Sequence, residues 1–477
     1  MNNYSLEKIK IIQGGMGVYI STPSLAKAVS LRGGLGTVSG VAPERIVATI
    51  LSRGDPGGHF RRAFSHFPFQ GFAKRLLDEF YIEQGDCKKT RHAVPVYRVN
   101  PSRISIELII CANFAFVWLA KEGHDRPISI NYLEKIAMPH VYAVTGAILA
   151  GVNVITMGAG LPLHIPPLID ALIKGGSVEY PVPVTGEKTP YMTQFDPAKF
   201  FGANLDITYR PCFIPIISSN SLAEICKKHL PEGSVQGFVV EESVAGGHNA
   251  PPRGRPVIMD DSGQPVYGNR DRVDYRRLAD LGYPFWIGGS YASPEKLEWA
   301  IENGAQGVQL GSMFALCDQS GMDPVLRGKI CRAGYRGEQK VFTDPVASPT
   351  GYPFKVAVVP DTLSEKKVYE SRKRICNQGV LVNLYRRRDG SIDYRCSAED
   401  VDNYTKKGGK PEDTIGRKCI CNGLMPTAGI NPDPNERPIV TIGDDLNFLP
   451  RLMPDENSGY NVENVFRYML EQQQALV

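Results

Sequence analysis

The feature that most constrains the fold of this chain is a series of eight short apolar segments, all before residue 315. Each segment is a nearly continuous run of hydrophobic residues, and most are followed by a segment of helical character. Such runs are typical of parallel strands that are covered on both faces. The predicted strands are residues 8–15, 35–40, 104–113, 152–159, 212–219, 237–243, 284–290 and 307–312.

Amphipathic segments that lie between these runs have the pattern of helices, as in residues 22–33, 221–230 and 293–304. The last begins at Ser293, a good N-cap, and ends at Gly304, a good residue to follow a helix. Eight repeats of strand and helix predict an α/β fold, the (β/α)8 or TIM barrel. An open doubly wound sheet is the alternative, and the count of eight favours the barrel.

Two segments interrupt the rhythm, at about residues 51–95 and 176–210. We expect them to be insertions, either peripheral decoration or a lid over the site. The repeating pattern ends near residue 318, so residues 1–318 are predicted to form the barrel and residues 319–477 a C-terminal extension packed on it. Within the extension, residues 381–396 have the pattern of a hairpin around Asp389-Gly390.

The composition is that of an ordinary globular protein, with 42% hydrophobic and 22% charged residues. A net charge of +4 lacks the concentrated basic field of nucleic-acid and membrane binders. The N-terminus has no signal-peptide pattern, so we expect a cytoplasmic protein whose cysteines are free thiols. Cys376, Cys396, Cys419 and Cys421 lack the paired spacing of zinc ligands, and no metal site is predicted.

Glycines close most of the predicted strands, which indicates where the site should lie. In a barrel the active site is formed at the carboxyl ends of the strands, and glycine there lets a flat ligand or a phosphate lie against bare backbone. Gly288-Gly289 and Gly311-Ser312 follow the seventh and eighth strands. Loops at these two places are the common phosphate site of such barrels, and we expect a phosphate there.

The sixth strand ends in Ala245-Gly246-Gly247-His248, which places one titratable ring at the same face. The segments "IIQGGMG", "VAGGHNAP" and "IGGSYASPEKLEWAIENGAQGVQLGSMF" resemble the nitronate monooxygenase (2-nitropropane dioxygenase-like) family of FMN-dependent TIM barrels. This family also includes the FMN-dependent enoyl-acyl-carrier-protein reductases. The resemblance covers most of residues 8–316, apart from the insertions.

The resemblance implies that FMN is the cofactor and assigns residues to it. Its phosphate is expected on Gly288, Gly289, Gly311 and Ser312, and its ring system across Gly14, Gly15 and Met16. Asn113 and Glu241 are expected to offer polar contacts, and Gly246 and Gly247 to let the ring approach. His248 is the predicted catalytic residue, since its ordinary pKa near 6.5 suits proton transfer or hydrogen bonding beside the flavin.

The activity implied first is oxidation of a small nitronate-like, carbanionic substrate by dioxygen. One alternative is an NAD(P)H-dependent enoyl-thioester reductase that is served by an acyl carrier protein. Because the first strand is not followed by a G-x-G-x-x-G fingerprint, NAD(P)H would act there only as a transient reductant stacked on the flavin. Another alternative is a flavin-binding accessory subunit of a biosynthetic complex. Val244 stands where many relatives carry an acidic residue.

Overall fold

The computed structural model describes residues 6–86, 92–431, 433 and 435–471. Eight parallel strands form one sheet in the order β1-β11-β10-β9-β8-β4-β3-β2. Their bounds are β1 Ile11–Gln13, β2 Gly36–Ser39, β3 Ile128–Leu133, β4 Val154–Gly158, β8 Cys212–Ile217, β9 Phe238–Glu241, β10 Phe285–Gly288 and β11 Gly307–Leu310.

Leu35, directly before β2, closes the sheet into a barrel. Its peptide N–H donates to the carbonyl of Ile11 (2.9 Å), and its own carbonyl accepts from the N–H of Gln13 (3.0 Å). Strand residues that point inward form a separate buried cluster around the fully buried Trp286, whose indole N–H donates to the carbonyl of Ile9 at 2.7 Å. The barrel interior is therefore packed rather than open, and the predicted (β/α)8 fold is confirmed.

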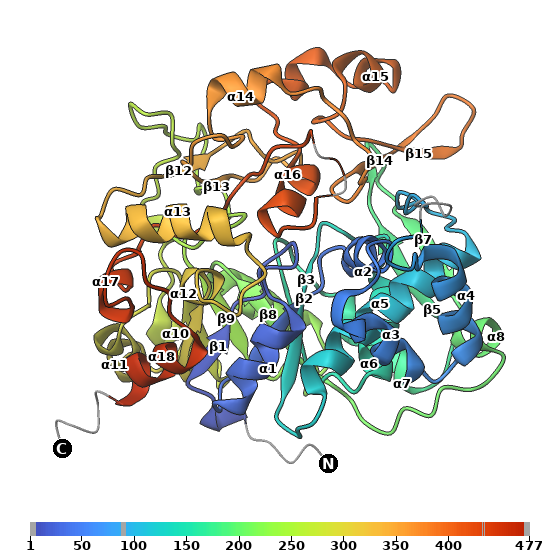
Figure 1. The fold of residues 1–477 in the computed structure, drawn as a ribbon, viewed down its shortest axis with the longest axis horizontal. Helices are drawn as coiled ribbons and strands as arrows, with labels where there is room; N and C mark the ends of the chain where they lie inside the picture. Colours follow the sequence, from blue (N-terminus) through green and yellow to red (C-terminus); the bar gives the residue numbers. More distant parts are fainter. Residues whose placement is uncertain (1–5, 87–91, 432, 434, 472–477) are drawn as a thin grey trace.

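Helices cover the outside of this barrel (Figure 1). The expected helices over residues 22–33, 221–230 and 293–304 are α1, α9 and α11, and the side chain of Ser293 caps α11 as predicted. Helix bounds up to residue 318 are α1 Pro23–Leu31, α2 Pro43–Leu51, α3 His59–Ser65, α4 Gln70–Phe80, α5 Arg103–Lys121, α6 His140–Leu149, α7 Ile165–Ile173, α8 Pro197–Phe201, α9 Asn220–His229, α10 Tyr275–Ala279, α11 Pro294–Glu302 and α12 Ser312–Ala315.

The predicted third strand, residues 104–113, is wrong, because this segment lies inside α5. The helix begins at the N-cap Ser102 and runs for 19 residues, and most of its residues are buried. A helix that is apolar on nearly all sides shows no helical periodicity and therefore has the pattern of a buried strand. The third strand is β3, Ile128–Leu133, so the segment between β2 and β3 is longer than expected.

The two predicted insertions pack against each other through phenylalanines. The first holds α3 and α4; the second holds β5 (Val178–Val182), β6 (Val184–Thr185), β7 (Tyr191–Phe195) and α8. Phe69 and Phe72 from the first insertion lie 4.3 and 5.5 Å, centroid to centroid, from Phe201 of the second. None of the described residues of either insertion (51–86, 92–95 and 176–210) lines the pocket described below. They therefore buttress one side of the barrel.

The C-terminal extension lies across the carboxyl end of the barrel, and its last helices return along the side (Figure 1). The predicted hairpin is confirmed as β14 and β15, although its loop, residues 387–391, is longer than the two residues expected. Element bounds in the extension are α13 Pro324–Tyr335, β12 Val341–Asp344, β13 Phe354–Ala357, α14 Lys366–Ser371, β14 Asn383–Arg386, β15 Ile392–Arg395, α15 Val401–Lys406, α16 Ile420–Thr427, α17 Leu449–Leu452 and α18 Val462–Phe466.

Candidate functional site

A pocket of about 240 Å³ lies at the carboxyl ends of the barrel strands, between the barrel and the C-terminal extension. A second cavity, beside Glu44 and Tyr97, holds only about 20 Å³. Of the site residues predicted from the sequence, all but Asn113 line the larger pocket: Gly14, Gly15, Met16, Glu241, Gly246, Gly247, His248, Gly288, Gly289, Gly311 and Ser312. The position of this pocket agrees with the rule that barrel sites form at this face.

Asn113 is not part of the site, since it belongs to α5 rather than to a strand end. Its amide donates to the carbonyl of Ile109 (2.9 Å) and accepts from the hydroxyl of Tyr132 (3.0 Å), so both ends of the side chain are used in the core. The residue that sequence reasoning missed is Asn131 on β3. It lines the pocket, and it would have been found if residues 128–133 had been recognised as the third strand.

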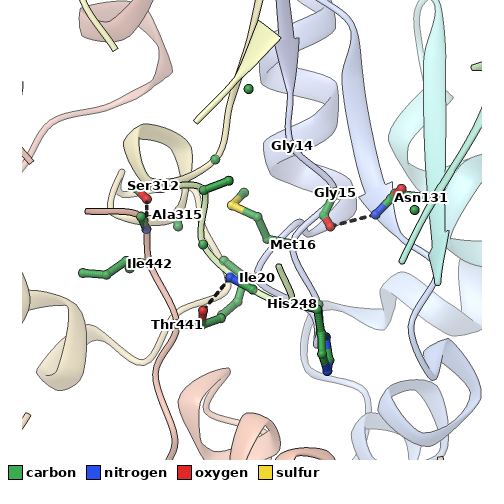
Figure 2. A pocket seen from close by; sticks show the side chains of 18 of the residues that line it. Gly14, Gly15, Met16, Ile20, Asn131, His248, Ser312, Ala315, Thr441 and Ile442 are labelled. Carbon is green, nitrogen blue, oxygen red and sulfur yellow. Dashed lines mark hydrogen bonds between the residues drawn. The ribbon is translucent and has the colours of Figure 1, made fainter. Parts of the chain in front are cut away.

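Asn131 holds the loop that follows β1 in place. Its side-chain amide donates to the carbonyl of Gly15 at 3.0 Å (Figure 2) and accepts from the hydroxyl of Thr156 at 2.9 Å. A Cβ atom on Gly15 would lie 2.1 Å from the Cβ of Asn131, so only glycine fits at this position. The backbone of Gly14–Met16 therefore forms a fixed, bare wall of the pocket.

The loops after β10 and β11 form a second bare wall. Gly289 has a φ of +109°, a conformation that strongly favours glycine. A Cβ atom on Gly311 would meet no other atom within 4 Å, because it would project into open space at the pocket. A larger side chain here would fill the volume that a ligand would occupy.

The two glycines after β9 have different neighbours from those expected. A Cβ atom on Gly246 would lie 2.8 Å from the carbonyl carbon of Ile442, so this glycine makes room for the C-terminal extension. Gly247, with a φ of +88°, has open space at its Cβ position, and its N–H donates to the hydroxyl of Thr441 at 2.7 Å (Figure 2). Gly246 therefore makes room for residues 441–445 of the extension, which we call the strap, whereas Gly247 faces the pocket.

The same strap reaches the loop after β11 and the helix after β10. The N–H of Gly443 donates to the hydroxyl of Ser312 at 2.8 Å. Asp445 accepts from the ammonium of Lys296 at 2.6 Å, and that ammonium also donates to the carbonyl of Ser290. The C-terminal extension thus completes the wall around the glycine loops, which could not be read from the sequence.

His248 is held by the C-terminal extension. Its Nε2 lies 2.7 Å from the hydroxyl of Ser348, and its ring packs edge-on against Phe354 at a centroid distance of 4.8 Å. In Figure 2 the ring extends away from Gly15 and Met16. Burial lowers the pKa of His248 to about 4, so the imidazole is neutral at pH 7 and acts as a hydrogen-bonding group rather than as a cation.

Glu241, the last residue of β9, is an acidic residue that lines the pocket on the barrel side. Burial raises its pKa to about 8, so the carboxyl group keeps its proton at neutral pH. The next residue, Glu242, accepts a hydrogen bond from the hydroxyl of Tyr275, which itself lies 3.4 Å from the hydroxyl of Tyr291. Because Glu241 is protonated, the pocket contains a carboxylic acid that can donate a proton or a hydrogen bond.

The wall that the C-terminal extension contributes is mostly apolar, and we call its apolar side chains the roof. Among the described residues of this region that line the pocket, only Asp445 is charged, and its carboxylate is paired with Lys296. The roof consists of Met322, Phe354, Val380, Leu381, Ile420, Leu424, Met425, Ile442 and Phe448. Such a surface accommodates an apolar part of a ligand and offers no partner for a permanent charge.

Within the residues that the structure describes, no three His, Cys, Asp or Glu side chains are arranged to hold a metal ion. Helix α5 is long and apolar enough to cross a membrane, but 72% of its most apolar window is buried inside the protein, as in a core helix.

Comparisons with known proteins bear on the fold. No family model matches the chain, and no curated protein does. FabK from Thermotoga maritima is similar over 98% of this chain and 94% of its own, with a TM-score of 0.50 and 16% identity. Nitroalkane oxidase from Streptomyces ansochromogenes covers 98% of both chains, with a TM-score of 0.44 and 12% identity.

The enoyl reductase domain of MlnA, from the macrolactin biosynthesis cluster of Bacillus amyloliquefaciens, covers 98% of this chain and 94% of its own, with a TM-score of 0.46 and 11% identity. At such low identity the similarity to FabK shows a shared fold and no more. The resemblance in the strand-end motifs is thereby confirmed at the level of the fold: this chain is a (β/α)8 barrel of the kind seen in FabK.

Proposed function

We propose that this chain is an FMN-dependent oxidoreductase that reduces the carbon–carbon double bond of an enoyl thioester. The observation that carries the proposal is the pocket itself: two bare glycine walls facing a protonated carboxylic acid under an apolar roof. The similarity to FabK supports the barrel fold on which this pocket is built.

The residues present fit FMN. The loops with Gly289, Gly311 and Ser312 are open on the pocket side, and barrels commonly bind phosphate there. The flat wall of Gly14–Met16, fixed by Asn131, suits one face or edge of a ring system. When bound, FMN would take a hydride from a nicotinamide donor and supply it to a substrate carbon.

Glu241 favours reduction over nitronate oxidation. Reducing a conjugated double bond consumes one hydride and one proton, so the site needs a group that carries a proton at neutral pH. Glu241 meets this requirement because its pKa is raised to about 8. A nitronate is already a carbanion equivalent and needs no acid for its oxidation. Nitronate oxidation, the activity expected first from the resemblance, therefore becomes the second candidate.

His248 and the roof provide the remaining contacts. A neutral imidazole, fixed through Nε2 by Ser348, can present its other nitrogen as a hydrogen-bonding group to a thioester carbonyl. The roof can cover the acyl chain and exclude water from the reacting carbons. In the overall reaction, enoyl thioester, NAD(P)H and one proton give the saturated thioester and NAD(P)+.

Anaerobic mixing tests the proposal. The purified protein, loaded with FMN, is mixed with NADPH or NADH, and the visible absorbance of the flavin is followed. Bleaching by a nicotinamide and recovery of colour on adding a 2-enoyl N-acetylcysteamine thioester is the expected result. Bleaching by an alkyl nitronate alone would establish the second candidate. Flavin that neither reagent bleaches, in a protein that co-purifies with a partner, would instead support an accessory subunit.

A further inference from the structure

The strap is a single layer of chain between the pocket and solvent. Ile442 and Gly443 are buried and line the pocket, whereas the next residue, Asp444, is exposed and does not line it. The described residues between α16 and α17, which include the strap, form neither helix nor strand. The position of the strap is therefore set by its contacts with neighbouring segments rather than by regular secondary structure.

The two ends of the strap are fixed to the C-terminal extension itself. Directly before the strap, the carbonyl of Val440 accepts from the N–H of Ala357 on β13 at 2.9 Å. After the strap, Leu446 and Leu449 pack so closely on α13 that a Cβ atom on Gly334 would collide with both. A segment that is anchored at both ends can move only in the middle, where it crosses the barrel loops.

Three hydrogen bonds and one ion pair tie the middle of the strap to the barrel. The hydrogen bonds join the N–H of Gly247 to the Thr441 hydroxyl (2.7 Å), the N–H of Gly443 to the Ser312 hydroxyl (2.8 Å) and the N–H of Asp444 to the Val244 carbonyl (3.2 Å). The ion pair joins Lys296 of α11 to Asp445 at 2.6 Å. Asp444 pairs with Lys355 of the extension instead, so Lys296–Asp445 is the one ion pair between strap and barrel within the described residues.

The Lys296–Asp445 pair is both strong enough to matter and open to water. Its ammonium also donates to the carbonyl of Ser290, so one side chain links the strap to the loop after β10. A charge-assisted bond of this kind is stronger than the neutral hydrogen bonds beside it. The side chains are 45% and 16% exposed, so water can replace the contact when the strap moves.

We propose that the strap is a gate through which FMN enters and leaves the pocket, and that the Lys296–Asp445 ion pair holds this gate shut. This role depends on the FMN cofactor proposed above and not on the substrate. The phosphate is expected at Gly289, Gly311 and Ser312, and the strap rests on Ser312. When the ion pair opens, the middle of the strap can lift from these loops while both anchors stay in place.

A direct action of the two charges on the phosphate is the alternative, and it has the opposite signature. Asp445 lines the pocket, so its carboxylate would repel a bound phosphate, whereas the ammonium of Lys296 would attract it. Removing one charge would then slow FMN release and removing the other would speed it. If the pair holds the strap, removing either partner opens the gate more often and speeds both release and uptake.

Stopped-flow fluorescence of FMN tests the proposal without any assay of turnover. Release is followed after strong dilution of the FMN-loaded protein, and uptake after mixing FMN with the flavin-free protein. Lys296→Met and Asp445→Asn should each raise both rates about fivefold, the size expected for a half-exposed ion pair. The double variant should be no faster than either single variant. Lys366→Met, which breaks an exposed ion pair with Glu370 on α14, is the control and should leave both rates unchanged.

Hydrogen exchange of the flavin-free proteins reports on the strap itself. A peptide covering residues 441–448 should exchange faster in Lys296→Met and Asp445→Asn than in wild type, whereas α16 should exchange at the same rate in all three. Rates that change in opposite directions in the two variants would overturn the gate in favour of direct action on the phosphate. FMN binding with unchanged rates in both variants would overturn this inference alone. A wild-type protein that takes up no FMN would overturn the proposed cofactor and the gate together.

Discussion

Replacing Glu241 by glutamine should stabilise the protein while impairing its chemistry. The structure raises the pKa of Glu241 to about 8, from an ordinary value of 4.5, because the carboxyl group is removed from water. At pH 7 the folded protein keeps this proton, whereas the unfolded chain releases it. Between pH 4.5 and 8 folding therefore takes up a proton, and the free energy of unfolding falls as the pH rises through this window.

The size of the effect follows from 1.36 kcal/mol for each pH unit between 4.5 and 7, which gives a penalty of about 3 kcal/mol at pH 7. This value is an upper one, since Glu241 borders the pocket, where water screens the charge. Glutamine has nearly the same shape and no proton to take up. The variant should therefore be more stable than wild type by roughly 1–3 kcal/mol at pH 7, with little difference at pH 4.5.

Urea unfolding at pH 4.5, 6, 7 and 8.5, with FMN at the same saturation in both proteins, measures this difference. Glu232→Gln, which removes an exposed carboxylate from the loop before β9, is the matched control. In turnover, the wild-type rate should fall as the pH rises past about 8, and the variant should be slow at every pH. A stability difference that does not change with pH, or full activity in the variant, would refute the reasoning.

Other variants test the remaining contacts. His248→Ala should keep FMN but lower turnover by about 10²-fold, since it removes one oriented hydrogen-bonding group, and unchanged kcat in steady-state assays would remove His248 from the mechanism. Met425→Trp should shorten the longest enoyl chain accepted, as measured by kcat/KM over C4 to C12 substrates, whereas Ile415→Phe at an exposed site should not. Thr441→Val removes the acceptor for the Gly247 N–H and should weaken FMN binding by about tenfold in fluorescence titrations; equal affinity would show that the strap does not shape the site.

Most of the barrel could be predicted because its strands are locally encoded. Seven of the eight predicted strands overlap the observed ones, since each is a short apolar run bounded by glycine or polar residues. The third could not be distinguished from α5 by composition, because a helix buried on nearly all sides has no polar face. That single error placed Asn113 at the site and concealed Asn131.

The roof and the role of Gly246 depend on contacts between distant parts of the chain. Ile442, which packs against Gly246, lies nearly 200 residues further along the chain. Thr441, which accepts from the N–H of Gly247, is 194 residues away from it. A glycine pair at a strand end indicates close approach, but not which partner approaches. The raised pKa of Glu241 likewise arises from burial by the assembled pocket, and no pattern of neighbours in the sequence reveals it.

Titration of the flavin-free protein with FMN tests the central claim most directly. Quenching of FMN fluorescence should saturate at one FMN per chain, and Gly311→Leu, whose side chain would project into the pocket, should weaken binding at least tenfold. Ile415→Phe, at the exposed surface of the extension, is the control and should bind FMN like the wild type. The absence of quenching in the wild-type protein, or equal affinity in wild type and Gly311→Leu, would contradict the account.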